Sequence, residues 1–154
     1  MNVSVVGLGY VGLITAGCLA RDGFNVWGVD LDEERVEAVQ KAKAPIVEAG
    51  LEALLKSGQA AGRLRATSRL PEAVAHTEVS VICVGTPFFP DKGYDLSALF
   101  SACHTIAKAV AEKGAPHVVI IRSTVYPGTT AKCAKLFEEQ APGATIFLLS
   151  LIHI

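Results

Sequence analysis

Residues 3–12 read Val3-Ser4-Val5-Val6-Gly7-Leu8-Gly9-Tyr10-Val11-Gly12, a short β-branched run followed by three closely spaced glycines. β-Branched residues favour a strand, and a helix-period pattern begins at Val11. A second apolar run, residues 26–29, stops at Asp30. The stretch therefore predicts a strand, a tight turn, a helix and a second strand that ends at an acid.

This arrangement of glycines suits a bound dinucleotide. Gly7 permits the sharp turn, Gly9 lets the backbone approach a pyrophosphate, and Gly12 lets helix and strand pack closely. The N–H groups and the dipole at the start of the helix favour phosphates. Asp30 is placed to accept hydrogen bonds from the adenosine ribose hydroxyls, and its charge opposes a 2′-phosphate. The predicted cofactor is therefore NAD rather than NADP, the alternative being a glycine turn without a ligand.

Composition narrows the class of protein. The chain has 154 residues, of which 51% are hydrophobic and 19% charged, and its formal net charge is −1. These values predict one packed domain and argue against nucleic acid as the main partner. No apolar run is long enough to cross a membrane, and the start lacks the basic region of a signal peptide. We therefore expect a cytoplasmic protein without a membrane partner.

The four cysteines and four histidines are scattered along the chain. No cysteine pair has the spacing of a metal or redox motif, and Cys18, Cys83 and Cys103 lie in apolar patterns that predict burial. We expect buried core cysteines rather than nucleophiles, and no metal site.

The rest of the chain alternates helical patterns with apolar strands. Helices are expected from an N-cap at Asp32, over 51–57, over 71–75, from an N-cap at Asp95 to Gly114, and over 131–140. The second of these is expected to end because Gly58 and Gly62 follow it. Strands are expected over 64–67, 79–84, 118–121 and 145–149, and loops over 44–50 and 88–94. This alternation predicts an α/β fold, a doubly wound (Rossmann-type) parallel sheet with helices on both faces.

Two further residues are placed near a ligand by this fold. Thr86 directly follows a predicted buried strand, and ligands of open parallel sheets bind beyond the carboxyl ends of strands. Its alternative role is that of a turn residue before proline. Arg35 lies one turn into the second helix, where it either flanks the adenosine end of the cofactor or is a solvated helix charge.

Four landmarks occur in order along the chain. They are Gly7-Leu8-Gly9-Tyr10-Val11-Gly12, Pro45-Ile46-Val47-Glu48-Ala49-Gly50-Leu51, Cys83-Val84-Gly85-Thr86-Pro87 and Arg122-Ser123-Thr124-Val125-Tyr126-Pro127-Gly128-Thr129. Together they resemble the N-terminal domain of the nucleotide-sugar 6-dehydrogenases, the UDP-glucose and GDP-mannose dehydrogenase family. Within it, the second and fourth landmarks are most similar to members that act on GDP-mannose, with UDP-glucose as the alternative substrate. Ala49 stands where the family usually has proline.

The resemblance implies an enzyme that oxidises the sugar C6 alcohol to a carboxylate with two NAD molecules. A cysteine captures the intermediate aldehyde, which splits one difficult step into easier ones. The resemblance also assigns the cofactor site, which with the glycines comprises Gly7, Gly9, Tyr10, Val11, Gly12, Asp30, Arg35, Thr86 and Thr124. It places Thr124 near the chemistry as well, as the one candidate catalytic residue, the alternative being a capping hydroxyl at a strand end.

The resemblance runs from Met1 to Thr145 and covers only the family's N-terminal domain. The family's catalytic cysteine has no counterpart here, and residues 148–154 do not match its Asn-Pro-Glu segment. We therefore expect an NAD-binding domain over 1–154, truncated before the central helix and the sugar-nucleotide domain and inactive alone. The full-length protein is expected to act on GDP-mannose or UDP-glucose as a homodimer. The alternatives are a non-catalytic NAD-binding module and a 3-hydroxy-acid type of dehydrogenase, which the threonine landmarks disfavour.

Overall fold

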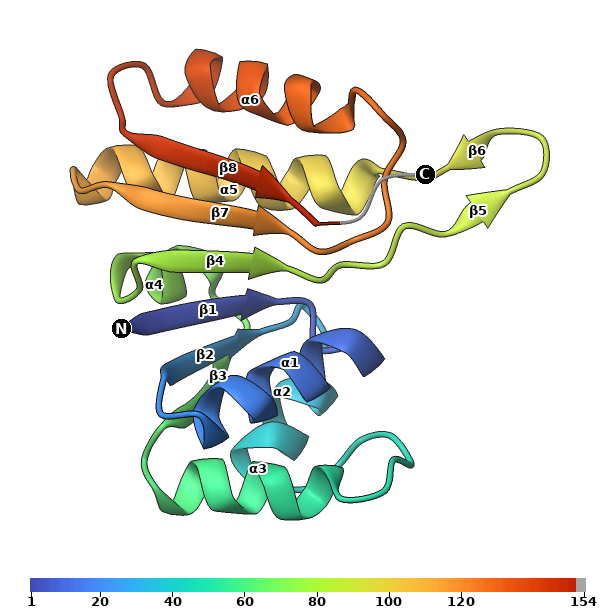
Figure 1. The fold of residues 1–154 in the computed structure, drawn as a ribbon, viewed down its shortest axis with the longest axis vertical. Helices are drawn as coiled ribbons and strands as arrows, with labels where there is room; N and C mark the ends of the chain where they lie inside the picture. Colours follow the sequence, from blue (N-terminus) through green and yellow to red (C-terminus); the bar gives the residue numbers. More distant parts are fainter. Residues whose placement is uncertain (152–154) are drawn as a thin grey trace.

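Within residues 1–151, the part of the chain that the computed structural model describes, six parallel strands form one sheet. In chain order they are β1 (Asn2–Val6), β2 (Asn25–Val29), β3 (Leu64–Thr67), β4 (Val79–Ile82), β7 (His117–Ile121) and β8 (Ile146–Ser150). Their spatial order is β3-β2-β1-β4-β7-β8, which places β1 between β2 and β4 (Figure 1). The end of the expected domain, residues 152–154 with His153, lies outside the described residues.

Helices cover both faces of this sheet (Figure 1). They are α1 (Tyr10–Arg21), α2 (Glu33–Gln40), α3 (Leu51–Ala60), α4 (Leu70–Ala75), α5 (Ser97–Lys113) and α6 (Thr129–Gln140). Successive residues of a strand point to opposite faces, so Val5 packs with α1, α2 and α3 while Val6 packs with α4, α5 and α6. The predicted doubly wound α/β fold is confirmed.

The buried face of α1 is made mainly of small residues. It comprises Gly12, Leu13, Ala16, Gly17 and Ala20. A Cβ on Gly17 would lie 2.6 Å from the Leu54 side chain, so the helix packs on α3 through its backbone.

The prediction that Cys18 is a core residue is wrong, because Cys18 is only half-buried, whereas Cys103 and Cys133 are buried as predicted.

Helix α3 continues three residues beyond its predicted end. Gly58 lies inside the helix, and a Cβ on it would lie 3.1 Å from the Ala20 Cβ and 3.2 Å from the Leu64 Cβ. Gly58 therefore allows α3 to pack closely against its neighbours, and the prediction that it ends the helix is wrong.

A two-stranded antiparallel hairpin replaces the predicted loop over residues 88–94. It consists of β5 (Phe88–Phe89) and β6 (Gly93–Tyr94), and it projects beyond the carboxyl ends of the sheet strands (Figure 1). The rings of Phe88 and Tyr94 meet edge to face, with centroids 5.2 Å apart. Strands of two residues show no alternation, so sequence periodicity cannot reveal them.

The two predicted N-caps have different outcomes. Asp32 caps α2 as predicted, accepting hydrogen bonds from the backbone N–H groups of Glu34 and Arg35. The N-cap position of α5 is Leu96, not Asp95, although Asp95 accepts a hydrogen bond from the Ser97 N–H at 2.9 Å.

Within residues 1–151 no helix, α5 included, has the length and hydropathy that a membrane crossing requires.

A buried chain of polar side chains crosses three strands of the sheet. The Ser4 hydroxyl lies 2.7 Å from the Ser80 hydroxyl, which lies 2.8 Å from Nε2 of His117. His117 is almost fully buried, and burial, reinforced by the positive charge of Lys113, lowers its pKa to about 4. The imidazole is therefore neutral in the folded protein at neutral pH.

Candidate functional site

A cleft of about 990 Å³ lies at the carboxyl ends of the strands. It is placed where the strand order reverses, between β1 and β4, which is the usual ligand position in an open α/β sheet. Ligand pockets typically measure about 300–1,000 Å³. Eight of the nine residues predicted for the cofactor line it, namely Gly7, Gly9, Tyr10, Val11, Asp30, Arg35, Thr86 and Thr124.

The ninth, Gly12, lies behind the wall of the cleft. A Cβ on Gly12 would lie 1.7 Å from the carbonyl oxygen of Gly7, so only glycine lets α1 pack on the turn. Gly7 itself has a φ of +97°, and a Cβ there would lie 2.9 Å from the Cys83 backbone. Apart from its chain neighbours, no atom of residues 1–151 lies within 4 Å of a Cβ built on Gly9, which leaves space for a ligand over the turn.

The amino end of α1 opens into this space. Gly9 is its N-cap residue and supplies no side-chain hydrogen bond to the first N–H groups of the helix. Tyr10 and Val11 follow it, and their side chains are exposed on the cleft wall. The helix dipole and the uncapped N–H groups make this end of α1 suited to an anionic group.

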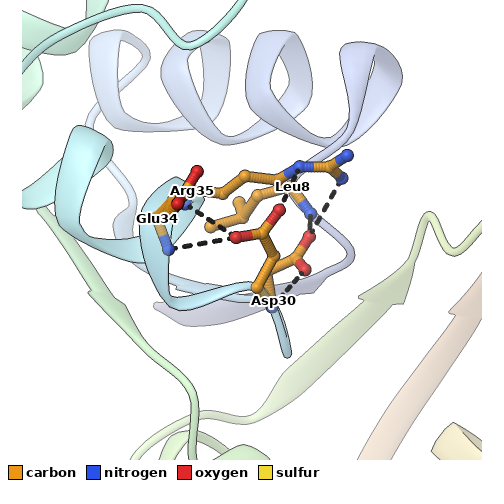
Figure 2. Close-up of polar contacts among 5 residues, drawn as sticks. Leu8, Asp30, Glu34 and Arg35 are labelled. Carbon is orange, nitrogen blue, oxygen red and sulfur yellow. Dashed lines mark hydrogen bonds and ion pairs between the residues drawn. The ribbon is translucent and has the colours of Figure 1, made fainter.

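Asp30 is held rigidly at the end of β2. Its Oδ2 accepts a hydrogen bond of 2.6 Å from the Leu8 N–H, and its Oδ1 accepts one of 3.0 Å from the Asp32 N–H (Figure 2). The side chain is 13% exposed. A carboxylate has about four acceptor positions, so Asp30 retains acceptor capacity for a diol on the ligand.

Arg35 lies beside Asp30 on the first turn of α2. Its Nη1 is 3.7 Å from Asp30 Oδ2, and its Nε is 3.2 Å from Asp32 Oδ2 (Figure 2). The side chain is 46% exposed. Arg35 thus forms part of the cleft wall while its side chain remains accessible.

Thr86 and Thr124 belong to loops that are joined to each other. The Thr86 hydroxyl donates a hydrogen bond of 2.9 Å to the Thr124 carbonyl oxygen. The Ser123 hydroxyl donates one of 2.6 Å to the carbonyl oxygen of Val84. These bonds tie the segment after β4 to the segment after β7, and both threonines line the cleft.

Cys83 and Arg122 also line the cleft, although sequence reasoning assigned neither to the site. Cys83 is half-buried rather than in the core, and burial raises the pKa of its thiol to about 11, against the opposing effects of Arg122 and Thr15. The thiol is therefore protonated at neutral pH and is a poor nucleophile. The Arg122 Nε donates a hydrogen bond of 3.3 Å to the Thr15 hydroxyl.

Glu48 is a further neighbour of the cleft that sequence reasoning did not assign. The Tyr10 hydroxyl donates a hydrogen bond of 2.7 Å to Glu48 Oε2, and this bond raises the pKa of the phenol. The contact ties the loop before α3 to the start of α1. Its only signal in the sequence was the second landmark, which contains Glu48.

Comparison with known proteins links this site to one family. The family model for the UDP-glucose/GDP-mannose dehydrogenase family, NAD binding domain, matches residues 1–150. The chain is 44% identical over 143 residues to the GDP-mannose 6-dehydrogenase of Pseudomonas syringae pv. tomato, covering 93% of this chain and 33% of that protein. It is 38% identical over 151 residues to the UDP-glucose 6-dehydrogenase of Rhizobium meliloti, covering 97% and 34% of the two chains.

Solved structures agree. A ternary complex of GDP-mannose dehydrogenase from Pseudomonas aeruginosa superposes with a TM-score of 0.92 at 41% identity, covering 96% of this chain and 35% of that one. A UDP-glucose dehydrogenase from Pyrobaculum islandicum has a TM-score of 0.92 at 37% identity, covering 97% and 35%. The chain spans about a third of the length of the relatives it matches.

Proposed function

This chain belongs to the UDP-glucose/GDP-mannose dehydrogenase family, and we propose that it is the cofactor domain of a GDP-mannose 6-dehydrogenase. It is an NAD-binding domain of that family, and NAD is its cofactor. The observation that carries the proposal is the cleft at the strand reversal, where the glycine turn, Asp30 and the two threonines meet. The proposed extent of the domain is residues 1–154.

The choice of GDP-mannose is supported by sequence similarity. Among the relatives compared, the GDP-mannose 6-dehydrogenase shares more identical residues with this chain than the UDP-glucose 6-dehydrogenase does. A UDP-glucose enzyme is the second candidate, supported by the equal TM-score of its structural neighbour.

We propose the following division of labour along the cleft. Asp30 and Arg35 bind the adenosine ribose, because the carboxylate retains acceptor capacity there. The glycine turn and the backbone of Tyr10 and Val11 bind the diphosphate at the amino end of α1. Thr86 and Thr124 bound the nicotinamide end of the cofactor site, where Thr124 is the residue of this chain nearest to the reacting sugar.

The reaction proposed for the full-length protein consumes two NAD per sugar nucleotide. When bound, NAD would supply the hydride acceptor, and two hydride transfers would take the C6 alcohol to the oxidation level of a carboxylate, whose second oxygen would come from water. Residues of this domain orient the cofactor, while the nucleophilic cysteine is expected elsewhere in the full-length protein. We propose further that this protein is a cytoplasmic homodimer.

Two measurements test these proposals. Calorimetric titration of the purified chain should detect NAD binding with NADP binding much weaker. The full-length protein should reduce NAD with GDP-mannose faster than with UDP-glucose, whereas the 154-residue chain should bind NAD without turnover. A folded chain that binds no NAD would overturn the cofactor assignment, and a preference for UDP-glucose would select the second candidate.

A further inference from the structure

The charged side chains that line the cleft do not all have partners. They are Asp30, Arg35, Arg69, Glu72 and Arg122. Arg35 pairs with Asp30 at 3.7 Å, and Arg69 pairs with Glu72 at 2.9 Å. Within residues 1–151, Arg122 forms no ion pair with a carboxylate. The opposite charges cancel within each of these two pairs, so the remaining charge on the cleft wall is the positive charge of Arg122.

Among residues 1–151, the two side chains that interact with Arg122, those of Cys83 and Thr15, supply no counter-charge. Its neighbour Cys83 is protonated at neutral pH because burial raises the pKa of the thiol to about 11. In the described part of the chain, the hydrogen-bond partner of its side chain is the neutral Thr15 hydroxyl, which Nε contacts. A guanidinium has five N–H donors, so four remain for a ligand. A half-buried cation without a partner is unfavourable, and a bound anion removes that cost.

Arg122 is also anchored at a defined distance from the amino end of α1. Its backbone N–H donates to the Ile82 carbonyl oxygen, which fixes the residue at the end of β7. Thr15, which Nε contacts, is itself bonded to the Val11 carbonyl oxygen. Thr15 therefore lies one helical turn, about 5.4 Å, from Val11. Arg122 and the first residues of α1 therefore line one cleft.

We propose that Arg122 supplies the counter-charge for the diphosphate of the bound dinucleotide. The inference rests on the proposed function, since it takes NAD as the ligand. The helix end provides N–H donors and a partial charge, and Arg122 provides a full charge with a planar donor set that matches phosphate oxygens. The diphosphate is thus held between a backbone site from the first half of the sheet and a side chain from the second half.

Charge and hydrogen bonding are separated by two substitutions. Arg122→Gln removes the charge but keeps an N–H donor for Thr15, and Arg122→Lys keeps the charge but loses the planar donor set. Arg21→Gln is the matched control, because Arg21 lies at the far end of α1, is exposed and pairs with Asp22. Each variant is titrated with NAD, ADP and adenosine. NAD and ADP both contain a diphosphate, whereas adenosine contains no phosphate.

We expect Arg122→Gln to weaken NAD and ADP binding at least about tenfold and to leave adenosine binding unchanged. Arg122→Lys should fall between the glutamine variant and the original chain, and Arg21→Gln should bind all three ligands normally. The NAD affinity of the original chain should also fall more steeply with added salt than that of Arg122→Gln.

Three results overturn the proposal. They are unchanged NAD binding in Arg122→Gln, a loss for adenosine equal to that for ADP, and a loss for NAD without one for ADP. If Arg122→Gln does not fold, Arg122→Met decides, because it also removes the charge, and unchanged ADP binding in it overturns the proposal. Absence of NAD binding in the original chain would instead overturn the proposed function, so the two failures are distinguishable.

Discussion

The hydroxyl of Thr86 donates a hydrogen bond of 2.9 Å to the backbone carbonyl oxygen of Thr124. The two residues are 38 positions apart in the sequence, and the bond joins the loops that follow β4 and β7. Together with the bond from the Ser123 hydroxyl to the Val84 carbonyl oxygen, it ties two loops that line the cleft.

Thr86→Val should loosen the contact between these two loops. Valine keeps the branched shape but lacks the donor, so the free energy of unfolding should fall by about 1 kcal/mol. NAD affinity should fall with it, because the loop is no longer held in place. Urea unfolding and NAD titration measure the two effects. Thr86→Ser retains the hydroxyl and should behave as the original chain does; a serine variant as weak as the valine variant contradicts the prediction.

Gly9 and Gly12 should respond in opposite ways to the same change. Gly12→Ala places a Cβ 1.7 Å from the Gly7 oxygen, and the expected loss of stability is more than about 3 kcal/mol. Gly9→Ala meets no protein atom within 4 Å and has a φ of −71°, so the chain should fold normally. Its NAD affinity should nevertheless fall, since the methyl group occupies ligand space. Thermal unfolding and calorimetry separate the two, and normal NAD binding by Gly9→Ala would place the diphosphate elsewhere.

Asp30→Ala should reduce the preference for NAD over NADP at least about tenfold. The substitution removes the ribose acceptor and the charge that repels a 2′-phosphate, and it leaves Arg35 with Asp32 as its remaining carboxylate neighbour within residues 1–151. Titration with both dinucleotides measures the preference. Asp22→Asn, which also removes one exposed carboxylate charge but outside the cleft, is the control.

Arg35 should then decide what the Asp30 variant binds. In the Asp30→Ala background, a second substitution, Arg35→Ala, should abolish the gain in NADP binding, because the Arg35 guanidinium no longer faces the Asp30 carboxylate and can bind the 2′-phosphate. Equal NADP affinity in the single and double variants would show that Arg35 takes no part.

Stability should depend on pH through His117. Its pKa is about 4 in the folded protein and near its ordinary value of 6.5 when unfolded, so the unfolded state binds the proton first as pH falls. The contribution is complete above about pH 6.5 and is lost progressively towards pH 4, with about 2 kcal/mol lost between pH 7 and pH 5. Urea unfolding at both pH values should show this loss in the original chain and a smaller one in His117→Gln. The same loss in both chains would assign it to other groups.

Local patterns were sufficient to predict much of this molecule. The strand, glycine turn and helix from Val3 onward need only neighbouring residues, and so does the acid after β2, which is why Asp30 could be placed in the site before the structure was known. The alternation of helices and strands likewise predicted the doubly wound sheet.

Contacts between residues far apart in the sequence could not be predicted from local patterns. Arg122 meets Thr15 across 107 positions, and Tyr10 meets Glu48 across 38, so no periodicity or spacing signals either pair. Gly58 was misread for a similar reason, since its neighbours Ala20 and Leu64 belong to other elements. Sequence shows that a residue is small, but only the tertiary structure shows what needs it to be small.

The position of β1 in the middle of the sheet has a consequence for assembly. Its partner β4 is synthesised only after β2 and β3, so the seam between β1 and β4 can close only when the first three strands have already been made. The cleft straddles this seam, with Gly7 and Asp30 on one side and Thr86 and Thr124 on the other. A dinucleotide bound across the seam would contact both halves of the sheet, and a ligand that binds only the folded state stabilises that state. Unfolding and proteolysis of the domain should therefore become rarer as the NAD concentration rises.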